Sequence, residues 1–236
     1  MPSKRTGIAL PPLQSPDFIK YILGRHQAPT TLLICSTKED FLKDFLSSSH
    51  NSQSVSESER DEDGQTPDSL LIPTIDLIAR SSTVKLAFVP TLPHLRAYLA
   101  SYRPSSKSPN QVVGTSGHRV PLLGVWGLAC LHRSTAEHSA QGFSRSLSLA
   151  IEAASYGDQK LVLGEPPMVH DAGELDDADA SNVTSEDPWK EKLPLLNGSI
   201  RFGGDDRILA GKTVEVEKVV AKWCRFVKLD PASDIT

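Results

Sequence analysis

The sequence predicts an α/β fold with a mostly parallel central sheet. Short apolar runs rich in β-formers alternate with amphipathic segments of helical period. Strands separated by helices are joined by crossover connections, which place successive strands parallel in one sheet. The last runs are strand-like with no helix between them, which predicts antiparallel strands at one edge near the C-terminus. Helices on both faces would make a three-layer sandwich.

Helical spacing of apolar residues predicts helices that alternate with apolar strands along the chain. The first helix begins at Ser15, where Pro16 and Asp17 suit a helix N-terminus. The other expected helices cover 38–46, 70–80, 92–102 and 139–154, and the expected strands cover 30–36, 84–89, 160–163, 200–202, 213–216 and 218–228. Residues 120–131 (VPLLGVWGLACL) form the most apolar run and predict a central strand that enters a turn.

Composition predicts one domain over residues 1–236, interrupted by two disordered insertions. Residues 47–68 and 171–187 are acidic and poor in apolar side chains, so burial cannot offset the entropy of ordering them. The formal net charge of −4 demands neither nucleic acid nor an anionic membrane as a partner. No uninterrupted apolar run approaches the ~18 residues of a membrane span, and no apolar segment typical of a signal peptide follows the N-terminus.

The motifs of common catalytic and cofactor sites are incomplete. The one Gly-Lys-Thr run, at 211–213, lacks the glycine five residues earlier that a phosphate loop needs, and strand-like sequence follows it. No dinucleotide fingerprint, nucleophile elbow or zinc spacing occurs, and Cys35, Cys130 and Cys224 lie singly in apolar runs. We therefore expect no enzyme activity, no catalytic residues, no cofactor and no metal. His132 and His138, after the central strand, are the residues on which an unrecognised α/β enzyme would depend.

Five basic or aromatic residues are candidate contacts with nucleic acid or a partner protein. Arg133 and Arg145 follow the central strand, and Lys222, Trp223 and Arg225 lie near the C-terminus. Cations interleaved with aromatic rings suit nucleic-acid backbones and bases. The alternative is that these charges only solvate an edge strand and loops.

The order of elements resembles the RecA-like recombinase paralogues. Residues 125–131 (VWGLACL) are similar to that family's Walker B strand and turn, and LLICSTKEDFLKDFL and VKLAFVPTLPHLRAYL are similar to its preceding strand–helix units. Trp126 stands where the family has the magnesium-positioning Asp, and Gly127 where it has Ser. The resemblance therefore implies a degenerate Walker B and a member without nucleotide motifs, of the Shu-complex type or, as second choice, an Elongator RecA-like subunit.

That resemblance implies a non-catalytic scaffold subunit of a DNA recombination or repair complex. Its partner would be another RecA-like protein, with DNA contacted through the complex, no membrane association, and a nuclear or nucleocytoplasmic location. Two alternatives stay open: an Elongator-type subunit in tRNA modification, and an α/β enzyme of unrecognised type. Trp126 is expected to be buried beneath the helix at 139–154, where it would close the nucleotide end of the strand.

Overall fold

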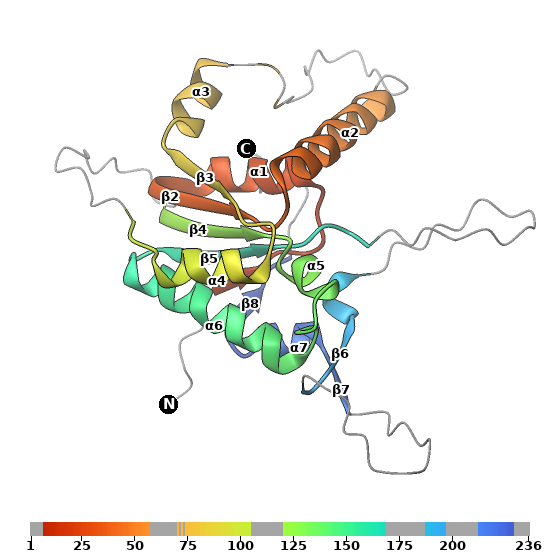
Figure 1. Cartoon of the computed structure of the whole chain (residues 1–236). Coiled ribbons are helices and arrows are strands. Elements are labelled where there is room, and N and C mark those ends of the chain that lie inside the picture. Colours follow the sequence, from red (N-terminus) through yellow and green to blue (C-terminus); the bar gives the residue numbers. More distant parts are fainter. Residues whose placement is uncertain are drawn as a thin grey trace, which may run out of the picture.

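A computed structural model describes residues 7–56, 70, 72, 74–104, 120–168, 187–196 and 212–228. Its centre is a six-stranded, all-parallel sheet in the order β3-β2-β4-β5-β1-β8 (Figure 1). These strands are β1 (Gly7–Ala9), β2 (His26–Ile34), β3 (Val84–Phe88), β4 (Val120–Trp126), β5 (Lys160–Gly164) and β8 (Cys224–Phe226). The predicted α/β class and mostly parallel sheet are therefore confirmed.

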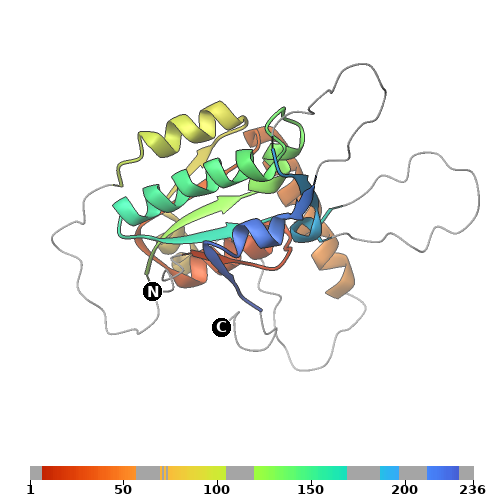
Figure 2. The same ribbon diagram turned by 90° about the horizontal axis from the view of Figure 1, so that it is seen from below.

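Helices cover both faces of this sheet, which gives the three layers that the sequence predicts (Figure 1). One face carries α1 (Ser15–Arg25) and α2 (Lys38–Ser56), and the other carries α4 (Leu92–Ala100), α5 (Leu128–Arg133), α6 (Ala140–Tyr156) and α7 (Val216–Val220). The short α3 (Ile75–Ser81) lies on the side of α1, next to the start of β3. Seen from below in Figure 2, α6 runs alongside the strands with α4 and α7 on either side of it.

Side chains of each strand alternate between two apolar cores, as the period of a strand requires. In β4, Leu123 and Val125 join the core beneath α4 and α6, whereas Leu122 and Trp126 join the core beneath α1 and α2. The long amphipathic helix predicted at 139–154 is confirmed as α6. The Ser139 hydroxyl caps it by accepting a hydrogen bond from the Gly142 amide.

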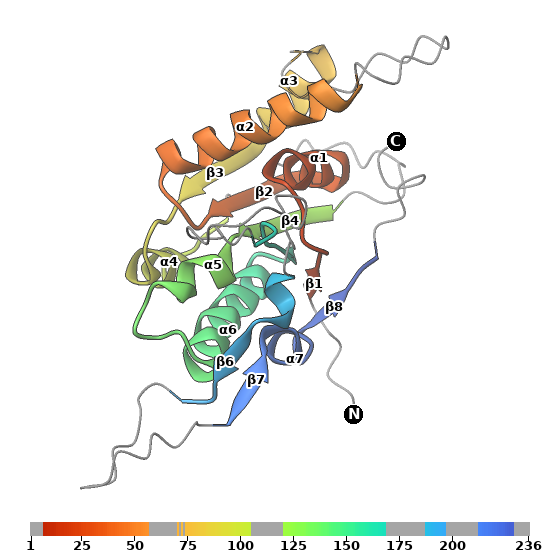
Figure 3. The same ribbon diagram turned by 90° about the vertical axis from the view of Figure 1, so that its right-hand side faces the viewer.

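The antiparallel strands near the C-terminus form a small sheet of their own. β6 (Lys192–Pro194) pairs antiparallel with β7 (Thr213–Glu215) at one side of the molecule (Figure 3). The prediction of a single strand over 218–228 is wrong. Residues 216–220 form α7, and only 224–226 form a strand, β8, which pairs parallel with β1. Val216, Val219 and Val220 are all buried, so helical packing against the core overrides their β propensity.

The first predicted insertion is corrected in part, because α2 continues through residue 56 instead of ending at 46. The rest of that insertion, most of the second one and the expected strand at 200–202 lie outside the described residues. The sequence also missed β1, whose three residues are too few to show an apolar period. Among the described helices, none is both long and apolar enough to cross a membrane.

Candidate functional site at the carboxyl edge of the sheet

The carboxyl ends of parallel strands are where α/β proteins usually bind ligands. Here the ends of β2, β4 and β5 are joined by backbone hydrogen bonds beyond the strands themselves. The Cys35 amide donates to the Trp126 carbonyl at 2.9 Å, and the Gly127 amide donates to the Gly164 carbonyl at 2.9 Å. Gly127 has φ of 78°, in the left-handed region that favours glycine, and this lets the chain turn from β4 directly into α5.

Trp126 fills the space above this edge. It is 5% exposed, and its ring stacks on Phe18 of α1 with centroids 4.7 Å apart. A Cβ on Gly164 would lie 2.5 Å from Phe18 and 2.9 Å from Trp126, so glycine in β5 is what lets both rings pack there. Trp126 is buried as expected, but the helix that covers it is α1 instead of α6. Trp126 follows Val125 in β4, so the two side chains point to opposite faces of the sheet.

A buried carboxylate, Glu165, follows β5 at the same edge. It accepts hydrogen bonds from the backbone amides of Ala129, at 2.7 Å, and Cys130, at 3.4 Å, in the first turn of α5. Burial raises the pKa of Glu165 to about 7, although the two amide hydrogen bonds act in the opposite direction. Glu165 therefore holds α5 against the end of β5, and its carboxyl group takes up a proton at a higher pH than an exposed glutamate does.

Two thiols lie near this carboxylate. Cys35 is buried, and its burial, with a smaller contribution from the charge of Glu165, raises the thiol pKa. Cys130 is exposed, yet partial desolvation and Glu165 raise its thiol pKa as well. A reactive cysteine needs a lowered pKa, so neither environment activates the thiol as a nucleophile.

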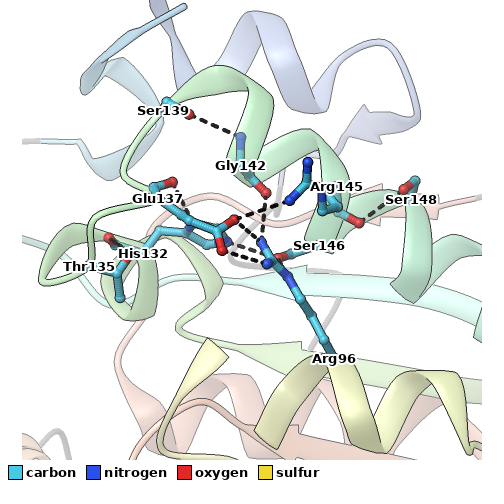
Figure 4. Close-up of polar contacts among 9 residues, drawn as sticks. All are labelled: Arg96, His132, Thr135, Glu137, Ser139, Gly142, Arg145, Ser146 and Ser148. Carbon is cyan, nitrogen blue, oxygen red and sulfur yellow. Dashed lines mark hydrogen bonds and ion pairs between the residues drawn. The ribbon is translucent and has the colours of Figure 1, made fainter. Parts of the chain in front are cut away.

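His132 belongs to a buried polar network (Figure 4). Its Nδ1 lies 3.2 Å from the Glu137 carbonyl, which can only accept, so Nδ1 carries the proton. Its Nε2 then accepts from the Ser146 hydroxyl at 3.1 Å. Burial lowers the pKa of His132 to about 4, so the ring is neutral at pH 7. His132 and Ser146 are both fully buried, and this geometry supports a structural role for the pair.

Arg96 of α4 completes the same network (Figure 4). Its guanidinium donates to both carboxylate oxygens of Glu137, at 2.8 and 2.6 Å, and its Nε donates to the Ser146 hydroxyl at 3.1 Å. The bidentate pair lowers the pKa of Glu137. Arg145 lies 3.8 Å from the same carboxylate. The network therefore joins α4, the loop after α5, and α6.

The other predicted site residues fall into two separate places. Arg133 donates to Glu191 at 3.0 Å, and His138 Nε2 lies 3.0 Å from the same carboxylate, so both side chains at the carboxyl edge have an acidic partner. Lys222, Trp223 and Arg225 lie instead around the start of β8, at the amino ends of the strands. The structure thus separates Arg133 and Arg145 from the three C-terminal candidates.

The sequence reasoning missed Glu165 and Arg96. An acidic residue directly after a buried strand was the available signal for Glu165, whereas nothing in the helix LPHLRAYLA marks Arg96 as a partner of Glu137. Thr213 of the Gly-Lys-Thr run lies in β7, so a strand follows Lys212 as predicted. Within the described segments, no group of three or more metal-ligating side chains is close enough to hold an ion.

Comparison with curated proteins gives no match. A family model described as SPAC22G7.03-like matches residues 17–230, which include the described helices, apart from the first two residues of α1, and the described strands except β1. By this match over most of its length, the chain belongs to the SPAC22G7.03-like family.

Proposed function

We propose that the chain is a non-catalytic, RecA-like scaffold subunit of a nuclear or nucleocytoplasmic DNA recombination or repair complex. It would act by assembling with another RecA-like protein. The parallel sheet supports this proposal, because the strand that resembles Walker B, β4, is central and its neighbours β2 and β5 are in parallel register. Trp126 and Phe18 occupy the carboxyl end of that strand, where an ATP-using relative needs room for phosphate and magnesium.

The observation that carries the assembly proposal is an apolar surface around the edge strand β3. We call this the β3 edge surface and define it by exposed aliphatic side chains of α2, α3 and β3: Leu42, Leu46, Ile75, Ile78 and Leu86. Ile75 is 89% exposed and Leu86 is 48% exposed. Figures 1 and 3 place all three elements on the same side of the molecule.

An unpaired strand edge flanked by apolar side chains favours a protein partner. Among the described strands β3 pairs with β2 alone, so its outer backbone groups face away from these strands. A partner strand can add to such an edge through backbone hydrogen bonds while aliphatic side chains on either side are buried. Contiguous exposed apolar patches on a protein surface are typical of interaction sites.

Affinity purification of the tagged full chain from its native cells, followed by mass spectrometry, tests the proposal. We expect a RecA-like recombination protein to be recovered. Recovery of Elongator subunits would replace the DNA-repair assignment with one in tRNA modification, and recovery of no RecA-like protein would refute both.

Two variants test where the partner binds. The double variant I78D/L86K places charges on the β3 edge surface at exposed positions, so it leaves the core intact. L196D changes an exposed leucine beyond β6 and serves as the control. The first variant should reduce recovery of the partner at least about fivefold and the second should not. Equal recovery with I78D/L86K would show that the partner binds elsewhere.

A further inference from the structure

The two edge strands of the six-stranded sheet differ in how readily they could pair with another chain. β8 has three residues, includes Arg225, and has Lys228 just beyond it. Short edge strands with charged side chains resist pairing with other chains. β3, at the opposite edge, has five residues (VKLAF), of which only Lys85 is charged. Of these two described edges, β3 is therefore the one that can accept a further strand.

The side chains of β3 divide into an apolar face and a mixed face. Val84 and Phe88 pack against the core beneath α1 and α2. Leu86 has the same parity, so it lies on that face too, and it is 48% exposed. Lys85 and Ala87 lie on the opposite face. Leu86 is thus an exposed apolar residue at the centre of the edge strand.

A second copy of β3 matches this strand in an antiparallel register. Two identical edge strands related by a twofold axis perpendicular to the sheet pair antiparallel, and an isologous contact of this kind is self-complementary. With the axis at Leu86, all five residues are paired, and the two copies of Leu86 face each other. Val84 then faces Phe88, and Lys85 faces Ala87. With the axis at Lys85, two ammonium groups would oppose each other, which destabilises a strand pair.

Aliphatic side chains of α2 and α3 enlarge this contact. They complete the β3 edge surface and lie on the same side of the sheet as Leu86, because both helices lie on the side of α1 (Figure 3). The five side chains of the surface are 43–89% exposed and present roughly 500 Å² per copy, which is about 1,000 Å² for two copies. That total reaches the lower limit for a specific interface, and backbone hydrogen bonds between the strands add to it.

We propose that the chain forms a homodimer in which two β3 strands pair antiparallel about a twofold axis at Leu86. The pairing joins two six-stranded sheets into one sheet of twelve strands. The inference rests on the β3 edge surface of the proposed function and deepens it. In the absence of a RecA-like partner, a second copy covers that surface, so the homodimer and the complex with the partner exclude each other.

Sedimentation velocity of the purified full-length chain, from about 1 to about 200 µM, tests for the dimer. We expect an equilibrium between species of 25.6 kDa and twice that mass, with a Kd in the micromolar range because the interface is near the lower size limit. L86K would place two lysines face to face at the axis and should raise the Kd at least about tenfold. L196K adds the same charge at another exposed leucine and should change the Kd less than about twofold.

Cysteine cross-linking tests the register. A C130S background removes the exposed native thiol. In that background, L86C places two thiols opposite each other, and directly opposed residues have Cα atoms about 4.5–5.5 Å apart, which a disulfide can bridge. K85C is the control, because its two copies would be diagonal neighbours, beyond the reach of a disulfide. On oxidation with copper phenanthroline, L86C should give at least about fivefold more covalent dimer than K85C.

The homodimer is refuted if the chain sediments as a single species of one-chain mass at every concentration, or if L86K and L196K weaken association equally. Cross-linking of K85C as efficient as that of L86C would refute the register. Circular dichroism and thermal unfolding establish that each variant is folded. Because the purified chain is measured alone, a monomer leaves the proposed function standing, whereas a dimer from cells that yield no RecA-like partner refutes the proposed function only.

Discussion

Trp126→Ala is a substitution for which the structure predicts a large loss of stability. The indole is almost completely buried, it stacks on Phe18, and it lies over Gly164 in a core shared with α1. Truncating a buried tryptophan to alanine removes its transfer free energy and leaves a cavity, for a cost of about 3–5 kcal/mol. The aromatic pair contributes about 0.5–1.5 kcal/mol of its own.

Thermal denaturation followed by circular dichroism measures this effect. For a chain of this length, each 1 kcal/mol lowers Tm by about 2–4 °C, so Trp126→Ala should lower Tm by about 6–20 °C. Trp126→Asp should cost at least as much, because a carboxylate would enter an apolar core without a partner. Trp126→Phe should cost less than either.

Trp223→Ala provides the matched control, because Trp223 is 38% exposed and belongs to neither apolar core. It should lower Tm by less than about 3 °C. A Trp126→Ala protein that melts within 2 °C of the wild type would refute the reasoning. That result would mean that the ring is not packed and that the end of β4 is open.

Three further predictions concern stability. The pKa of Glu165 is raised on folding from about 4.5 to about 7, so its favourable contribution to stability is present below pH 4.5 and disappears as the pH rises to 7. Over that pH range, urea unfolding should show that the wild type loses about 3 kcal/mol of stability relative to Glu165→Gln. Parallel stability–pH profiles of the two proteins would contradict this. The pKa of His132 is lowered on folding from 6.5 to about 4, so acidification from pH 6.5 to 4 should reduce the stability of the wild type by about 3 kcal/mol more than that of His132→Gln. An equal loss of stability on acidification in the two proteins would contradict this prediction. Gly164→Ala should destabilise the protein by about 1–3 kcal/mol in thermal unfolding, because the new Cβ would collide with Phe18. Gly24→Ala in α1 has open space around the new Cβ and should stabilise the protein by up to about 1 kcal/mol. The reverse order of stabilities would refute the packing around Gly164.

The carboxyl edge shows how far local sequence reasoning reaches. The apolar run of β4 and the glycine after it predict a central strand and a turn, and the structure has both. The alternation along β4 also determines that Trp126 and Val125 point to opposite faces. Which helix covers each face depends on the path of the whole chain, and for that reason the expected cover of Trp126 by α6 was wrong.

By itself, the sequence determined the fold class and the order of most elements, because period and composition are properties of contiguous residues. Tertiary structure decided that residues 216–220 are helical, since burial of Val216, Val219 and Val220 outweighs their local preference for strand. It also decided the surroundings of Glu165 and the gathering of Lys160 and Arg225 at one edge. Burial and electrostatic interaction depend on distances between segments far apart in the chain, and only the packed sheet sets those distances.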